Sequence, residues 1–187
     1  MAGSAGPDVG PTFDVAVVGY GPVGMTMAAL LGRAGHRVLV LERYSGLYNL
    51  PRAAILDDET MRTFATLGVA DALLPRSSAQ VSYEWRNGEG QLLTQVDYAA
   101  VGRSGWAEWY GHYQPDLEDA LHAACRAAAV QVDFDSPITA IDQDGERVAL
   151  TVGGERPRTV TARYAIACDG GNSFVRDALG IDQDDYG

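Results

Sequence analysis

The sequence predicts an α/β fold: a parallel sheet built around a β-α-β unit, together with part of an antiparallel sheet. Phe13–Val18 is a continuous run of β-branched and apolar residues, which is typical of a strand buried on both faces. A glycine-rich turn leads into an apolar helix over Pro22–Arg33, and a second strand follows over residues 37–41. Two alternating runs, Ser82–Arg86 and residues 91–96, flank the turn Asn-Gly-Glu-Gly and predict an antiparallel hairpin.

The other elements are placed by capping and helix-breaking residues. Pro22 suits the first turn of the first helix, and Gly35 suits its end. Asp57 or Asp58 caps a further helix, which Gly68 ends. The remaining elements follow in order: a helix over 116–129, a strand over 130–134 parallel to the first two, a hairpin with arms at 138–143 and 147–152, a strand over 163–167 and a helix over 173–179.

Composition and charge narrow the classes of function. The chain has 187 residues and a formal net charge of −11, which disfavours nucleic acid and anionic membrane surfaces as partners. No apolar run approaches the ~20 residues of a membrane span. The two cysteines, Cys125 and Cys168, have no metal-ligand spacing and are interpreted as buried thiols in a reducing cytosol. We therefore expect a cytoplasmic protein with no metal site.

The turn after the first strand has the spacing G-x-G-x-x-G, formed by Gly19, Gly21 and Gly24. In such a turn the first glycine permits the tight bend, the second lets the backbone approach a pyrophosphate, and the third lets helix and strand pack closely. The amino end of the following helix presents free N–H groups and a partial positive charge to the phosphates. The candidate phosphate-binding residues are Gly19, Gly21, Pro22, Val23 and Gly24.

An acid stands where the second strand ends. Glu42 lies 18 residues beyond Gly24, close to the ~20 expected for a residue that accepts hydrogen bonds from an adenosine ribose. A carboxylate there would repel a 2′-phosphate, so NADP is disfavoured at this loop, while NAD and FAD both remain open. The alternative is a solvated acid at a strand end. Arg43, the next residue, is a further candidate for cofactor binding.

A second fingerprint is the stretch A-C-D-G-G-N-S-F-V-R-D-A-L-G-I, residues 167–181. Together with the glycine loop, this stretch resembles the class A FAD-dependent aromatic-ring hydroxylases, a family of flavoprotein monooxygenases. The resemblance extends over most of this chain but covers only the N-terminal portion of the family's chains. The resemblance implies that Asp169 and Gly170 support the bound flavin nucleotide and that this segment takes part in NAD(P)H docking. The alternative is an ordinary Asp-Gly turn between a strand and a helix.

Two more positions match the family. Arg52 lies in L-P-R-A-A-I-L-D-D-E-T-M-R, which resembles the branch acting on hydroxyphenylpropionate, related phenols and polyketide aromatics. The resemblance implies that Arg52 reaches the FAD pyrophosphate, for which a planar guanidinium is well suited. Gln114, in Y-Q-P-D-L-E-D-A-L, matches a glutamine that contacts the cofactor. The alternatives are a surface charge for Arg52 and a polar residue at a helix start for Gln114.

The resemblance also implies a reaction. NADH or NADPH would reduce the flavin, and a flavin hydroperoxide would transfer one oxygen atom to a phenolic or polycyclic aromatic substrate. Because the cofactor carries this chemistry, no catalytic triad is expected and the catalytic residues stay unknown; His36 and His112 are interpreted as structural. The family's third motif, a Gly-Asp segment, is not found. We therefore expect a portion of an enzyme, completed by a missing C-terminal portion or a second chain.

The predicted domains follow from these assignments. Residues 1–12 form a flexible leader, 13–78 and 111–187 a Rossmann-like FAD-binding domain, and 79–110 an insertion with part of an antiparallel substrate-domain sheet. Two other functions stay open: a non-catalytic flavin- or nucleotide-binding module that pairs with a second chain, and a simple NAD-binding Rossmann dehydrogenase.

Overall fold

The computed structural model describes residues 12–184, and its contacts divide the chain into two compact units. The first unit runs up to Tyr48 and resumes at Cys125, while the second is Asn49–Ala124. The second unit is larger than the insertion predicted over 79–110, because 49–78 and 111–124 group with it. The assignment of 79–110 to substrate binding stays a prediction. The predicted leader, apart from Thr12, lies outside the described residues.

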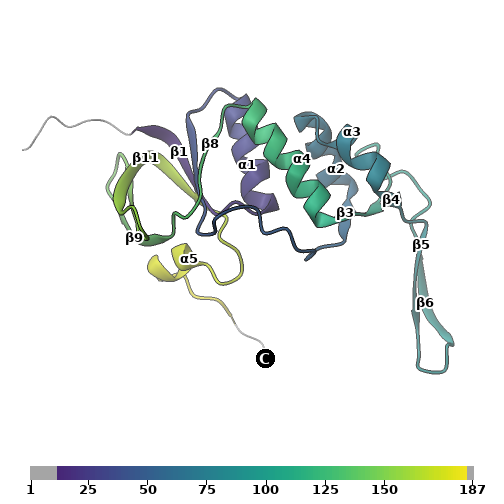
Figure 1. Ribbon diagram of the computed structural model, residues 1–187. Coiled ribbons are helices and arrows are strands. Elements are labelled where there is room, and N and C mark those ends of the chain that lie inside the picture. Colours follow the sequence, from purple (N-terminus) through teal and green to yellow (C-terminus); the bar gives the residue numbers. More distant parts are fainter. Residues whose placement is uncertain (1–11, 185–187) are drawn as a thin grey trace, which may run out of the picture. The chain divides into compact units, whose positions relative to one another are not determined.

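The first unit contains a mostly parallel six-stranded sheet in the order β8-β2-β1-β11-β10-β9 (Figure 1). Neighbours among β8, β2, β1 and β11 pair in parallel, and β10 pairs antiparallel with both β11 and β9. This arrangement confirms the predicted α/β class and its β-α-β unit. The strands are β1 (Phe13–Val18), β2 (Val38–Leu41), β8 (Gln131–Asp133), β9 (Ile138–Gln143), β10 (Val148–Val152) and β11 (Arg158–Ala167).

The core of the first unit forms where the antiparallel strands meet the parallel ones. Apolar residues of β1 and β2 cluster with residues of β10 and of the first half of β11: Ala16, Val18, Leu39, Leu41, Leu150, Val152, Val160 and Ala162. The strand predicted over 163–167 is therefore only the second half of β11. The first half pairs with β10, from Arg158 opposite Val152 to Ala162 opposite Val148.

Helix α1 (Pro22–Arg33) connects β1 to β2, as predicted. Its small and apolar residues Gly24, Met25, Ala28 and Ala29 are buried, and the helix packs against β1 and β2 (Figure 1). The helix ends at Ala34, and Gly35 follows with φ +89°, a left-handed conformation that favours glycine. The short helix α5 (Phe174–Ala178) follows β11.

The second unit combines helices with short antiparallel strands. Helix α2 begins as predicted, because Asp57 Oδ1 accepts a hydrogen bond from Thr60 N–H at 2.7 Å, and Gly68 ends it with φ +75°. The elements of the second unit before α4 are β3 (Ile55–Asp57), α2 (Asp58–Leu67), α3 (Ala70–Leu73), a 3-10 turn η1 (Leu74–Arg76), β4 (Ser78–Ala79), β5 (Ser82–Arg86), β6 (Leu92–Asp97) and β7 (Trp109–Gly111). Strands β3, β7 and β4 form one small sheet.

Helix α4 (Gln114–Ala127) starts and ends two residues earlier than the predicted 116–129. Ala129 has φ +55°, which takes the chain out of helical geometry beyond the last turn. At 14 residues α4 is the longest helix of the described part. Within residues 12–184, none of the helices combines the length and the apolar character that a membrane crossing requires.

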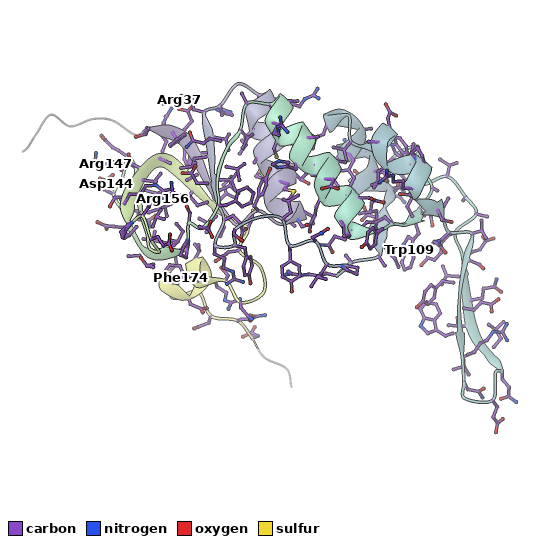
Figure 2. The ribbon with its side chains drawn as sticks, viewed as in Figure 1. Arg37, Trp109, Asp144, Arg147, Arg156 and Phe174 are labelled. Atoms are coloured by element: carbon purple, nitrogen blue, oxygen red, sulfur yellow. The ribbon has the colours of Figure 1, made fainter. Side chains whose placement is uncertain are left out.

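Strands β5 and β6 form the predicted hairpin, and all their residues are exposed. Asn87 shapes its turn, since Oδ1 accepts hydrogen bonds from the N–H groups of Glu89 (3.0 Å) and Gln91 (2.9 Å). Trp109, labelled in Figure 2, lies at the base of this hairpin. Its ring stacks on Tyr98 at 4.6 Å between centroids and meets Tyr83 edge-on at 5.8 Å.

Candidate cofactor-binding site

Four parallel strands end level with one another at one edge of the first unit's sheet. The paired residues are Val18 with Leu41, Leu41 with Asp133, and Val18 with Ala167. In open α/β sheets, ligands bind outside the carboxyl ends of the strands. Three predicted segments leave the sheet at this edge: the glycine loop after β1, Glu42 after β2, and Asp169-Gly170 after β11.

The glycine loop runs in close contact with the end of β11. Gly19 has φ +97°, and a Cβ atom there would lie 2.5 Å from the carbonyl oxygen of Cys168. A Cβ atom on Gly24 would collide with the carbonyl oxygen of Gly19 and would lie 3.3 Å from Cys168 Cβ. Gly21 differs, because a Cβ atom there would meet no atom of the described chain within 4 Å. The loop therefore has two glycines packed against protein and one facing open space.

The amino end of α1 is open to an anion. Gly21 is its N-cap, Pro22 occupies the first turn, and the first helical hydrogen bond runs from Met25 N to Gly21 O (2.9 Å). Among the described residues no side chain caps this end, and the first turn carries no acid. The N–H groups of Val23 and Gly24 thus have no acceptor within the helix, and they lie at its positive end.

Glu42 fastens the glycine loop to the end of β2. The side chain is buried; Oε2 accepts a hydrogen bond from Tyr20 N–H at 2.6 Å, and Oε1 accepts one from Tyr44 N–H at 3.0 Å. Each carboxylate oxygen can accept a further hydrogen bond. Glu42 can therefore hold the loop and still accept from ribose hydroxyl groups. The sequence predicted the ribose contact, which stays a prediction, and missed the contact with the loop.

Asp169 organises the start of α5. Its Oδ1 accepts a hydrogen bond from Ser173 Oγ (2.6 Å), and its Oδ2 accepts one from Val175 N–H (3.1 Å). Ser173 Oγ in turn accepts from Arg176 N–H (3.0 Å) and caps the helix, which begins at Phe174 (Figure 2). Gly170 between them has φ +87°. The fingerprint thus encodes a closed strand-to-helix turn, and direct contact of Asp169 with a nucleotide stays a prediction.

Arg43 is exposed beside Glu42. The Cζ atom of its guanidinium lies 4.9 Å from the centroid of the Tyr44 ring, a cation–π arrangement. The Tyr44 ring lies 6.0 Å from the ring of Tyr48, and both rings are partly exposed. A positive charge and two aromatic surfaces therefore follow the buried acid.

The predicted residues Arg52 and Gln114 lie in the second unit. Gln114 is buried, and its Oε1 accepts hydrogen bonds from the backbone N–H groups of Arg52 (3.1 Å) and Ala53 (2.8 Å). Its Nε2 donates to Glu118 Oε1 at 2.6 Å. The structure thus brings Gln114 to the backbone of the Arg52 segment; the cofactor contacts predicted for both residues stay predictions.

Sequence reasoning missed the contacts by which Tyr44, Glu118 and Ser173 shape these segments, although Ser173 is part of the second fingerprint. Local signals exist for two of them. Glu118 stands four residues after Gln114, a spacing that places side chains on one face of a helix. Ser173 directly precedes a helix, the position that a capping hydroxyl prefers. Tyr44 takes part through its backbone N–H, which no residue pattern reveals.

His112 is half-buried, with its ring nitrogens turned away from solvent. Both ring nitrogens are inaccessible to solvent and have no hydrogen-bond partner among residues 12–184. Burial lowers the pKa of His112 below its usual value of 6.5. A neutral ring held in this way fits the structural interpretation made from the sequence.

The cysteines lie in the first unit. Cys125 is buried and its Sγ donates to Met25 O at 3.2 Å, whereas Cys168 is only half-buried, contrary to the expectation of two buried thiols. Burial raises the pKa of both thiols. In the part of the chain that the structure describes, no three His, Cys, Asp or Glu side chains gather as a metal site.

These features together fit the adenosine diphosphate half of a dinucleotide. An uncapped helix end and the open space at Gly21 suit a pyrophosphate, and a buried acceptor after the next strand suits a ribose. The first unit therefore defines a dinucleotide-binding domain of the Rossmann-like class.

Comparison with known proteins specifies the family. A family model described as "FAD binding domain" matches residues 12–186. The chain belongs to this family of FAD-binding domains, which confirms the predicted preference for FAD over NAD.

The relatives are aromatic hydroxylases. A protein named "Probable NADH-specific resorcinol 4-hydroxylase" of Rhodococcus jostii (strain RHA1) is 48% identical over 93% of this chain and 34% of its own length. A 3-(3-hydroxy-phenyl)propionate/3-hydroxycinnamic acid hydroxylase of Mycolicibacterium smegmatis is 35% identical over 91% of this chain and 31% of its own length. The chain thus spans about a third of the length of these curated relatives.

Solved structures agree with this assignment. The p-nitrophenol 4-monooxygenase PnpA from Pseudomonas putida DLL-E4 has a TM-score of 0.86 and 29% identity, over 94% of this chain and 45% of that chain. Aklavinone-11 hydroxylase, in a ternary complex with FAD and aklavinone, has a TM-score of 0.78 and 30% identity, over 95% of this chain and 36% of that chain. The predicted resemblance to class A aromatic-ring hydroxylases is confirmed.

The contact between Gly24 and Gly19 generates a first prediction. Gly24→Ala would place a methyl group on the Gly19 carbonyl oxygen, so α1 or the loop must move. We expect the free energy of unfolding to fall by about 1–3 kcal/mol, as in other overpacked sites. Urea denaturation measures this change; a variant as stable as the parent would show that the contact is easily relieved.

The half-buried ring of His112 generates a second prediction. Its pKa is lower in the folded state than in the unfolded state, so its contribution to stability is present above the unfolded pKa and is lost as pH falls through the folded pKa. We expect the free energy of unfolding to decrease between about pH 7 and pH 5 more steeply in the parent than in His112→Gln. Denaturant titrations of both proteins across this range test it. Parallel pH profiles would contradict it.

Proposed function

We propose that the chain is the FAD-binding portion of a NAD(P)H-dependent monooxygenase that hydroxylates a phenolic or polycyclic aromatic substrate. The observation that carries the proposal is the set of aligned strand ends, where the glycine loop and buried Glu42 meet. Bound FAD would supply electron transfer from NAD(P)H and the activation of oxygen. The residues of this chain would bind and orient that group.

The residues at the strand ends have proposed roles in binding the cofactor. The N–H groups of Val23 and Gly24 would donate to the pyrophosphate, beside the open space at Gly21. Glu42 would accept from the ribose hydroxyl groups and repel a 2′-phosphate. The other proposed cofactor-binding residues are Gly19, Pro22, Arg43, Arg52, Gln114, Asp169 and Gly170; no catalytic residue is assigned.

The names of the relatives support a phenol as substrate and NADH as electron donor. The Rhodococcus relative is named as NADH-specific and acts on resorcinol, and the Mycolicibacterium relative is named for hydroxyphenylpropionate. The match to an FAD-binding family argues against a simple NAD-binding dehydrogenase. A missing C-terminal portion or a second chain as partner, and a cytoplasmic location, stay proposals.

The open space at Gly21 generates a third prediction, on FAD binding. Gly21→Ala has ordinary backbone geometry, with φ −76°, and meets no described atom, so stability should change by no more than ~0.5 kcal/mol. Its methyl group would occupy the approach of a phosphate, and we expect the Kd for FAD to rise at least tenfold. Flavin fluorescence titration measures Kd. Gly145→Ala, at an equally open glycine in the β9–β10 turn, is the control. Equal affinities in all three proteins would place the pyrophosphate elsewhere.

The proposed reaction generates a fourth prediction. The whole enzyme, in which this chain is completed by its missing C-terminal portion or second chain, should when supplied with FAD oxidise NADH and consume oxygen faster with resorcinol than with benzoate, with one oxygen atom appearing in the product. This chain alone should show little or no such activity. Absorbance of NADH, an oxygen electrode and mass spectrometry of the product measure this. Tight FAD binding by the completed protein without substrate-dependent NADH oxidation would instead support the non-catalytic flavin-binding module.

A further inference from the structure

A buried acid on α4 faces the amide of Gln114. Gln114 and Glu118 are only 4% and 3% exposed, and Gln114 Nε2 donates to Glu118 Oε1 at 2.6 Å. On its other side, Gln114 Oε1 accepts from the N–H groups of Arg52 and Ala53. One side-chain amide therefore connects the buried carboxylate to the backbone of the Arg52 segment.

The orientation of this amide follows from its partners. The oxygen of a glutamine amide only accepts hydrogen bonds, and its nitrogen only donates them. Glu118 offers an acceptor on one side, while Arg52 and Ala53 offer two donors on the other. The reversed amide would place donor against donor and acceptor against acceptor in a buried place, where unmet hydrogen bonds are costly. Glu118 therefore selects the orientation in which the Gln114 oxygen faces the segment.

The Arg52 segment has little packing to hold it. Residues 50–55 are all exposed, so few apolar contacts restrain the chain there. A third hydrogen bond, from His112 N–H to Ala54 O (2.9 Å), fixes the segment one residue further on. Segments with few buried contacts depend on their hydrogen bonds for local stability. The two bonds to Gln114 therefore restrain the backbone conformation at Arg52.

We infer that Glu118 is a positioning residue, which acts through Gln114 to hold the Arg52 segment in one conformation for phosphate binding. The phosphate role of Arg52 rests on the proposed function, whereas the restraint on its backbone does not. When the acceptor at position 118 is removed, the Gln114 amide is free to turn, and the N–H groups of Arg52 and Ala53 lose their acceptor.

Amide hydrogen exchange and FAD affinity test this inference in the whole chain. In Glu118→Leu we expect exchange at Arg52 and Ala53 to become at least tenfold faster and the Kd for FAD to rise about tenfold. Glu118→Gln keeps an acceptor oxygen and should restore most of the protection. Asp116→Asn is the matched control on the same helix: it breaks the ion pair with Arg76 (2.7 Å) and should leave exchange at Arg52 and Ala53 unchanged.

A double-mutant cycle separates positioning from general destabilisation. If Glu118 acts through Gln114, Glu118→Leu should have no further effect on exchange at Arg52 and Ala53 in a Gln114→Leu background. Additive effects, or unchanged exchange in a Glu118→Leu protein that still unfolds cooperatively, would overturn the inference. If the parent protein fails to bind FAD, the proposed function is wrong, and the exchange data still decide the role of Glu118.

Discussion

The candidate site depends on two backbone carbonyl oxygens that lie too close to glycine Cα atoms for any side chain to fit between them. The Cys168 oxygen lies 2.5 Å from where a Cβ atom of Gly19 would be, and the Gly19 oxygen would collide with a Cβ atom of Gly24. Strand β11, the loop and helix α1 are therefore stacked backbone against backbone. This close stacking aims the first turn of α1 at the edge where the parallel strands end, so the geometry of the anion site is a consequence of packing.

Negative charge at this edge of the sheet is compensated by neighbouring backbone N–H groups. The chain has a formal net charge of −11, so an anionic cofactor approaches an unfavourable overall field. Glu42 adds a further negative charge next to the loop, and backbone N–H groups of Tyr20 and Tyr44 compensate it. The acid thereby leaves the N–H groups at the start of α1 free of a side-chain acceptor, as the proposed phosphate contact requires. A buried carboxylate and a helix end proposed to bind phosphate can thus lie side by side, because each has its own set of N–H donors.

Much of the fold was predictable because its signals are local. The apolar run of β1, the glycines after it, the Asp57 cap and the Asn87 turn each specify their structure within a few residues. The first half of β11 and strands β3, β4 and β7 were missed, because they are short or are defined by pairing with distant residues. At the site, glycine spacing and Glu42 were readable as a pattern. The contacts of Glu42 with Tyr20 and of Gln114 with Arg52 depend on tertiary packing, so the sequence pattern did not predict them.

The parallel pairing of β1 with β11 has a consequence for synthesis of the chain. Phe13 pairs with Ala162 and Val18 with Ala167, so the second strand to be matched emerges from the ribosome about 150 residues after the first. Contacts of such sequence separation form slowly, because a long loop must close before they are made. Until then, one edge of β1, an apolar strand, lacks its partner and is open to pairing with other chains. Slow closure of this sheet leaves that edge exposed in the nascent chain, and the glycine loop acquires its final shape only after Cys168 has been synthesised.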